Sequence, residues 1–200
     1  MKKVILFILF TLSISSAAFA ESKTFVRADY GLGKFKSDKL DSLNANPSGS
    51  NFGFEFGSRM GYVEVGIFYK GSKYEANINH DGVANKIDHK SKSFGLDLNI
   101  FLNRHFSLKV GYAVNNYSQK LATPLSALAM SSVKTTYGLE DDKTSTNIFY
   151  GANVDIFGGK TYDVYASILQ FPMGDGKSNL TGQIGIRIYM NSSFADFFDR

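Results

Sequence analysis

The chain has 200 residues, of which 44% are hydrophobic, and it contains neither Cys nor Trp. The absence of Cys excludes disulfide bonds and thiolate metal sites. The formal net charge of +4 becomes +2 when Lys2 and Lys3, which lie in a segment expected to be removed, are subtracted. This small excess gives no reason to expect nucleic acid as a partner.

Residues 1–20 have the features of a bacterial secretory signal peptide. Two lysines precede an apolar stretch at residues 4–14, and Ala18-Phe19-Ala20 is a typical small-residue cleavage site. The apolar stretch is shorter than the roughly 18 residues that a membrane-spanning helix needs. We therefore expect export, cleavage after Ala20 and a mature chain that begins at Glu21.

Eight segments of the mature chain alternate apolar and polar residues, which predicts amphipathic β-strands. In the last segment, Ile184, Ile186 and Ile188 alternate with Gly185 and Arg187. Segments of about ten residues suit tilted strands that cross a bilayer, and an even number of strands is typical of bacterial barrels. The expected strands are residues 25–33, 51–60, 62–72, 93–102, 106–115, 146–157, 161–171 and 180–190.

The expected connections alternate between short and long, as they do in outer-membrane barrels. Short turns are expected near Gly61, at residues 103–105 and at residues 158–160. Long polar connections are expected at residues 36–50, 75–90, 116–143 and 172–179. This order places the short turns and both chain ends on the periplasmic side.

The direction of the apolar face separates a soluble, lipocalin-like barrel from a membrane barrel. Glycines recur on the polar face, where a narrow lumen would need room for large polar side chains. On the exterior of a soluble barrel they would only weaken the strands. The apolar face also becomes aromatic near strand ends, as expected of interfacial girdles. We therefore favour a membrane barrel, with girdle residues Phe25, Phe52, Phe94, Phe106, Tyr112, Tyr150 and Tyr162.

In this orientation the charged residues of the strands face the lumen. Their positive and negative charges are nearly balanced, as expected of paired interior groups, because an unpaired buried charge is very costly. We interpret them as a structural network rather than as a proton or ion path. The candidate network consists of Arg27, Asp29, Glu55, Arg59, Glu64, Asp97, Lys109, Asp155 and Arg187; Lys70 and Asp163 are further charges on the same face.

The pattern of the mature chain resembles the small eight-stranded outer-membrane barrels, the superfamily of the OmpA membrane domain, OmpX and Opa-type proteins. Gln183, Gly185, Ile188 and Met190 also resemble the C-terminal signal that the outer-membrane assembly machinery reads in this family. Met190 stands where the family usually has an aromatic residue, and residues 191–200 follow it, which we interpret as a short periplasmic tail.

The resemblance implies an all-β, eight-stranded, antiparallel, up-and-down transmembrane barrel over residues 21–190. It also implies a monomer in the outer membrane, with outer-membrane lipid, lipopolysaccharide and the assembly machinery as partners.

A catalytic alternative rests on the sequence His89-Lys90-Ser91. This order resembles the His-x-Ser of barrels that deacylate lipid A, and both side chains would share one strand face. No acid is identifiable to orient the histidine, so we interpret His89 as a solvated loop residue and the chain as non-enzymatic. His80 and His105 are isolated, and we expect neither a metal site nor a cofactor.

The long connections are stronger candidates for function, since binding residues often lie on loops held by a rigid scaffold. Thr123 and Pro124 precede an apolar run at residues 125–130, which predicts a short helix with Thr123 as its N-cap. Its candidate binding residues are Leu125, Leu128 and Met130, although they could instead pack on the barrel rim.

We expect a structural or adhesin-like role in which the loops contact a host or other surface ligand. A narrow channel for small or hydrophobic solutes is the first alternative. A lipid A-modifying enzyme is the second.

Overall fold

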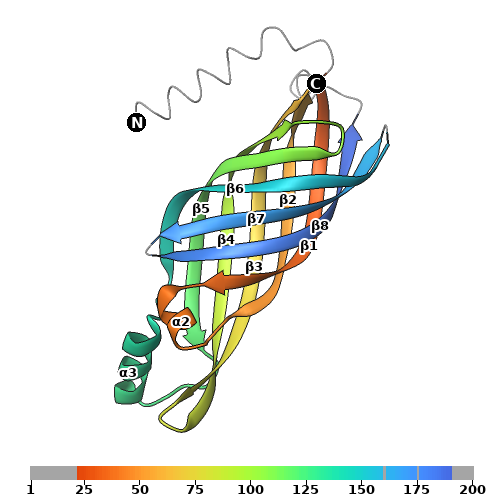
Figure 1. The fold of residues 1–200 in the computed structure, drawn as a ribbon. Helices are drawn as coiled ribbons and strands as arrows, with labels where there is room; N and C mark the ends of the chain where they lie inside the picture. Colours follow the sequence, from red (N-terminus) through yellow and green to blue (C-terminus); the bar gives the residue numbers. More distant parts are fainter. Residues whose placement is uncertain (1–21, 160, 175, 191–200) are drawn as a thin grey trace.

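Eight antiparallel strands form a closed barrel in the computed structural model, which describes residues 22–159, 161–174 and 176–190. Each strand pairs with its neighbours in the chain, and β8 pairs with β1 (Figure 1). The expected up-and-down barrel is therefore confirmed. The strands are β1 (Ser22–Lys36), β2 (Ser48–Met60), β3 (Val63–His80), β4 (Val83–Phe101), β5 (Phe106–Leu121), β6 (Lys143–Gly158), β7 (Tyr162–Gly174) and β8 (Lys177–Met190).

The barrel has two different ends. Short connections at residues 61–62, 102–105 and 159–161 lie at one end, called the turn end below, as the sequence predicted. The helices α2 (Asp38–Ser42) and α3 (Ala127–Tyr137) lie together at the opposite end, called the cap end (Figure 1). In the described part of the chain, neither helix has the length and apolar composition to cross a membrane.

The prediction of a long loop is wrong for two of the four segments, which are mostly strand in the structure. Residues 75–90 continue β3 and β4 as a paired hairpin that turns at Asp81 and Gly82. Residues 172–179 are largely strand, since β7 and β8 pair as far as Gly174 and Lys177. Only the connections at residues 37–47 and 122–142 are long, and these carry α2 and α3.

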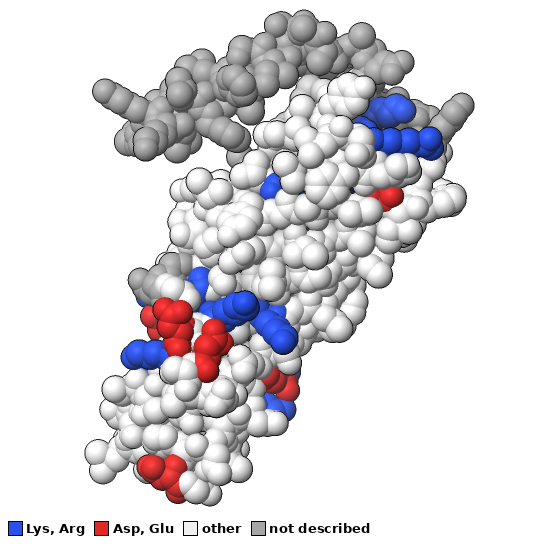
Figure 2. Space-filling model, in the orientation of Figure 1, with Lys and Arg blue, Asp and Glu red and all other residues white. Residues whose placement is uncertain are grey.

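The apolar face of the barrel points outward. Isoleucine, leucine, valine and aromatic side chains from every strand are exposed and form an apolar belt around the barrel, which Figure 2 shows as a broad, nearly white surface between the two ends. Such a surface is far larger than a soluble monomer exposes, and it suits contact with lipid tails. The belt includes Val26, Tyr30, Leu32, Phe52, Phe54, Ile67, Tyr69, Phe94, Leu96, Ile100, Leu108, Tyr112, Ile148, Tyr150, Ile168, Ile184, Ile186 and Ile188.

One expected girdle residue faces the other way. Phe25 is fully buried in the lumen, where the guanidinium of Arg27 lies 5.2 Å from the centre of its ring. It lies two residues before Arg27, and residues two apart on a strand point to the same side. The girdle assignment of Phe25 is therefore wrong.

Glycines on the inner face make room for larger neighbours. A Cβ at Gly53 would lie 2.6 Å from a carboxylate oxygen of Asp29, and one at Gly66 would lie 2.8 Å from Glu55. These separations are too short for real carbon contacts, so the carboxylates could not keep their places beside a larger residue. The narrow lumen thus explains the glycine repeat.

Candidate functional site: the lumen and its outer cap

The half of the lumen nearer the turn end contains a network of buried ion pairs. Arg27, from β1, contacts Glu55 at 2.9 Å and Glu64 at 2.7 Å. All three side chains are almost completely buried. Buried carboxylates and guanidinium groups need such mutual contacts because water cannot solvate them.

Arg187 occupies the opposite side of this network. It contacts Asp163 at 2.8 Å, Glu64 at 3.3 Å and Asp155 at 3.4 Å. The hydroxyl of Tyr189 donates to Asp163 at 2.7 Å and accepts from Arg187 at 2.9 Å. Arg187 therefore faces inward and is paired, although neither Asp163 nor Tyr189 was among the candidate network residues.

Lys109 extends the network from β5, since its ammonium contacts Glu55 and lies 2.8 Å from Asp97. Arg59 lies at the mouth of the turn end, 3.7 Å from Glu64, and donates to the Tyr189 hydroxyl at 2.7 Å. Its side chain is 27% exposed, so it closes the network toward solvent.

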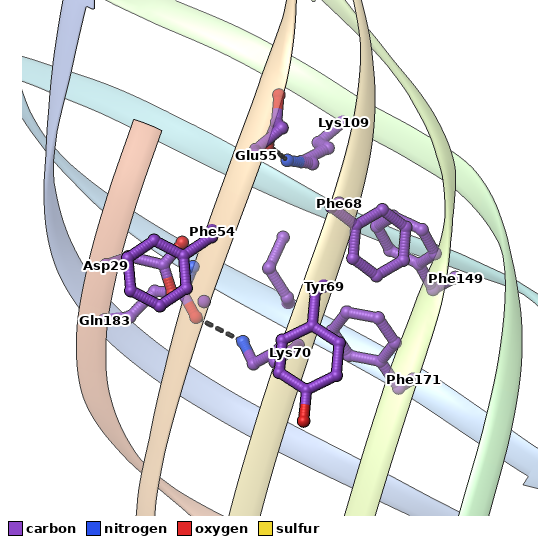
Figure 3. Close-up of a pocket in the computed structure, with 12 residues that line it drawn as sticks. Asp29, Phe54, Glu55, Phe68, Tyr69, Lys70, Lys109, Phe149, Phe171 and Gln183 are labelled. Atoms are coloured by element: carbon purple, nitrogen blue, oxygen red, sulfur yellow. Dashed lines mark hydrogen bonds and ion pairs between the residues drawn. The ribbon is translucent and has the colours of Figure 1, made fainter. Parts of the chain in front are cut away.

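On the cap-end side of the network, three aromatic rings pack against one another inside the lumen. Phe68, Phe149 and Phe171 (Figure 3) have ring centres 4.5–6.0 Å apart. Leu169 and Ala113 complete the layer. These residues occur in the polar register of their strands. An aromatic residue in that register is the sequence signal that could have predicted this layer.

Asp29 lies apart from the ion pairs, near the aromatic layer. It accepts from the hydroxyl of Tyr165 at 3.3 Å, and together with Lys70 it borders a cavity of about 20 Å³. Lys70 donates to Gln183 and, at 3.1 Å, to Thr181 (Figure 3 shows the Lys70–Gln183 bond). A cavity of this size holds about one water molecule and no larger ligand.

His89 lies in the lumen beyond the outer edge of the apolar belt, so its assignment as a solvated loop residue is wrong. It is fully buried, with its ring stacked on Phe35 at 3.9 Å and beside Tyr74. Burial, together with the positive charge of Lys177, lowers the pKa of His89 to about 3. Ser91 faces the same way, but its hydroxyl accepts from Asn179 at 3.1 Å.

This geometry does not assemble a catalytic pair. A histidine with such a low pKa is a poor base at neutral pH, and neither ring nitrogen has a hydrogen-bond partner among the described residues. The described part of the chain likewise contains no group of three or more His, Asp or Glu side chains that could hold a metal ion.

An apolar cluster seals the cap end of the lumen. Leu40 of α2 and Val133 and Tyr137 of α3 pack with buried residues from the outer ends of the strands. The hydroxyl of Tyr137 donates to the carbonyl of Asn79 at 3.1 Å, which ties α3 to the end of β3. The strand residues of this cap cluster are Phe35, Tyr74, Ile78, Ile87, Tyr117 and Met173.

The candidate helix forms, but its predicted start is wrong. Ser126, not Thr123, is the N-cap of α3, and the helix ends at Gly138 in the left-handed conformation. Thr123 is instead bound by Asn85, whose side chain pairs with its backbone N–H and carbonyl at 3.2 and 3.0 Å.

The three candidate binding residues separate in the structure. Leu125 packs against the cap cluster and Met130 is half-buried, whereas the side chain of Leu128 is 87% exposed.

Glu140 fastens the segment after α3 to the barrel. Its carboxylate binds the hydroxyl of Tyr117 at 2.7 Å and the ammonium groups of Lys143, at 2.9 Å, and Lys177. Partial burial alone would raise the pKa of Glu140, but these hydrogen bonds and the charge of Lys177 outweigh it and lower the pKa to about 2.

Solved structures with the same overall fold are outer-membrane barrels. Ail, the attachment invasion locus protein of Yersinia pestis, is 14% identical at a TM-score of 0.51, with 85% of this chain and 99% of Ail covered. Ail has also been solved with the heparin analogue sucrose octasulfate, and that structure is 16% identical at a TM-score of 0.50, with coverage of 85% and 99%. Neisserial surface protein A is 14% identical at a TM-score of 0.51, with coverage of 84% and 98%.

No protein-family model matches the sequence, and no curated protein does. The resemblance seen in the sequence is confirmed at the level of the fold: the chain has the fold of the small eight-stranded outer-membrane barrels.

Proposed function

We propose that the chain is a non-enzymatic outer-membrane protein that contacts a host or other surface ligand through its cap end. The observation that carries this proposal is the filled lumen, in which ion pairs, an aromatic layer and the cap cluster follow one another. A lumen packed in this way leaves the exposed outer surface as the place for interaction. Ail, which has the same fold, is named as an attachment invasion locus protein and has been solved with a heparin analogue. Both facts support a role in surface interaction.

The exposed face of α3 is the part of the cap that we propose to contact the ligand. Leu128 projects an apolar side chain into solvent from a helix whose other side is fixed by Val133 and Tyr137. A rigid element with an exposed apolar residue suits recognition better than a mobile loop, because less ordering is needed on binding.

Adhesion of bacteria that express the protein tests this function. We expect Leu128→Asp to reduce adhesion to matrix-coated surfaces, with unchanged folding and surface level, since the side chain contacts little of the protein. Thr136→Asp, an exposed position near the other end of α3, is the matched control for added charge. Equal adhesion of the deletion strain and the wild type would contradict the proposal.

The boundaries of the mature chain are also proposals, because residues 1–21 and 191–200 lie outside the described residues. We propose that residues 1–20 are removed during export and that residues 191–200 form a periplasmic tail. Mass spectrometry of the protein from outer membranes should give a first residue of Glu21. A retained Met1 would contradict the proposed cleavage.

A further inference from the structure

Lysines replace the apolar belt on the outer faces of β3 and β4 directly beyond its edge at the cap end. On β4, the outward residues change from Leu96 and Phe94 to Lys92 and Lys90. On β3, exposed Lys73 lies two outward positions beyond Tyr69. We call Lys73, Lys90 and Lys92 the lysine patch; all three point away from the lumen and are exposed.

The pairing of the strands brings these positive charges together. Lys73 and Lys90 are direct partners in the β3–β4 register. Two like charges at opposed positions of an antiparallel pair repel each other. A bound anion between the two ammonium groups would remove this repulsion.

Two carboxylates, Glu75 and Asp88, are register partners on the cap-end side of the patch. Glu75 contacts Lys73 at 2.7 Å. By contrast, Lys90 and Lys92 form no ion pair with any residue in the described part of the chain. Their partners in β5 are Ser118 and Asn116, which are uncharged.

Neutral hydrogen-bonding groups border the patch on its β5 side. The amide oxygen of Asn116 accepts from the hydroxyl of Thr144 at 2.7 Å, which directs that oxygen toward β6 and leaves the NH₂ group as a donor. Asn116 is exposed and lies beside Lys92. Lysine ammonium groups beside amide and hydroxyl donors suit a phosphate group.

The depth of the patch indicates which phosphate it meets. Two residues of strand advance about 7 Å, and the tilt of the strands reduces this to about 5 Å along the membrane normal. Lys92 therefore lies about one headgroup layer beyond Phe94. If the cap end faces outward, as the proposed function requires, this is the headgroup level of the outer leaflet.

We propose that the lysine patch binds the phosphate groups of a phosphorylated glycolipid in the outer leaflet, a class that includes lipid A. The inference rests on the orientation given under the proposed function, but not on any ligand of α3. The acyl chains of the same lipid would contact Tyr69, Phe94 and Leu96 below the lysines. One lipid would thus bridge the charged and apolar parts of this face.

Native mass spectrometry of the detergent-solubilised mature protein, titrated with bisphosphorylated lipid A, tests this site. We expect the double substitution Lys90→Gln/Lys92→Gln to weaken binding about 30-fold, as expected for the removal of two lysines from a charged lipid surface. Dephosphorylated lipid A should bind the wild type weakly, and the double substitution should not weaken its binding further. Binding should also weaken as salt is raised.

The matched control is Lys23→Gln/Arg104→Gln, which removes two exposed positive charges at the turn end. It should bind lipid A like the wild type. An equal loss of lipid A affinity in both double variants would overturn the proposed site. So would unchanged affinity in the Lys90→Gln/Lys92→Gln variant. A parallel titration with soluble heparin distinguishes a lipid ligand from a sulfated polysaccharide. If the Lys90→Gln/Lys92→Gln variant lost affinity for heparin but not for lipid A, the proposed site would also be overturned. Adhesion measured on the same variants keeps this result separate from the role of α3.

Discussion

Glu64 is the carboxylate that joins the two arginines of the lumen. It contacts Arg27 at 2.7 Å and Arg187 at 3.3 Å, and its side chain is fully buried. Two guanidinium groups that share a small lumen repel each other unless a negative charge lies between them. Glu64 is therefore the residue at which a loss of charge should have the largest effect.

We expect Glu64→Gln to destabilise the folded barrel by about 3 kcal/mol, because removal of one partner leaves a buried charge uncompensated. Urea unfolding in lipid vesicles, followed by far-UV circular dichroism because the chain has no Trp, measures the change. Arg59→Gln is the comparison: Arg59 is 27% exposed, so water can replace part of its contacts with Glu64 and Tyr189, and its loss should cost less than that of Glu64. Equal losses would show that the network is not organised around Glu64.

The bonds of Glu140 make the attachment of the cap dependent on pH. The ordinary pKa of 4.5 is lowered to about 2 in the folded protein, so folding favours the charged carboxylate. The stabilisation is complete above about pH 4.5 and is lost as the pH falls toward 2. We expect NMR signals of Leu139 and Tyr117 to shift in that range, and Glu140→Gln to remove the dependence. A shift centred near pH 4.5 in the wild type would contradict the bonded carboxylate.

At the scale of elements, the hairpin of β3 and β4 shows how far the sequence pattern could be read. Within the belt, apolar residues face outward, and the alternation predicted these strands correctly. Beyond the belt the pattern inverts: Lys73 and Glu75 face outward, while Tyr74 and Ile78 face the cap cluster. The rule that apolar residues face lipid cannot recognise such a segment, so the sequence predicts a loop at residues 75–90 where the structure has a hairpin.

The tip of this hairpin depends on backbone conformation. Asp81 and Gly82 both have positive φ, at 52° and 78°, as expected of a type I′ turn. We expect Gly82→Ala to cost about 1 kcal/mol locally, because an L-residue is strained there, and to speed amide hydrogen exchange at residues 78–86.

Gly182→Ala is the matched control for the hairpin, because a Cβ at Gly182 meets nothing within 4 Å and its φ is not in the positive range. That change should leave exchange at the hairpin unaltered and stabilise β8 slightly, since glycine is unfavourable inside a strand. Unchanged exchange in both variants would contradict a strained turn.

The limits of sequence reasoning are clearest for α3 and His89, where distant contacts decide the outcome. Thr123 and Pro124 have the composition of a helix start, but the side chain of Asn85 holds Thr123 outside the helix. His89 is enclosed by Phe35 and Tyr74, which come from two other strands. Neither contact can be predicted from the residues that lie next to Thr123 or His89 in the sequence. The fold could be predicted because period-two alternation is local, and these tertiary contacts could not.

At the scale of the whole molecule, the barrel is closed by three different barriers in series. The cap cluster lies at the cap end, the rings of Phe68, Phe149 and Phe171 lie in the middle, and ion pairs occupy the half nearer the turn end. The barriers share strands, β3 among them, but they lie at different levels of the barrel and each depends on a different kind of interaction. We expect removal of the cap to leave the other two barriers in place, whereas a channel gated only by its loops would open.

We expect no steady conductance in planar bilayers when residues 122–142 are replaced by a short Asn-Gly turn. Both β5 and β6 retain their pairing within the belt in this variant, so the rings of the aromatic layer, whose centres are 4.5–6.0 Å apart, and the ion pairs stay in the lumen. The matched experiment adds Phe68→Ala and Phe171→Ala to the same variant, which removes two of the three rings but not the ion pairs. A conductance that appears with the turn alone would show that the cap is the gate of a pore, and it would favour the channel over the surface-interaction function.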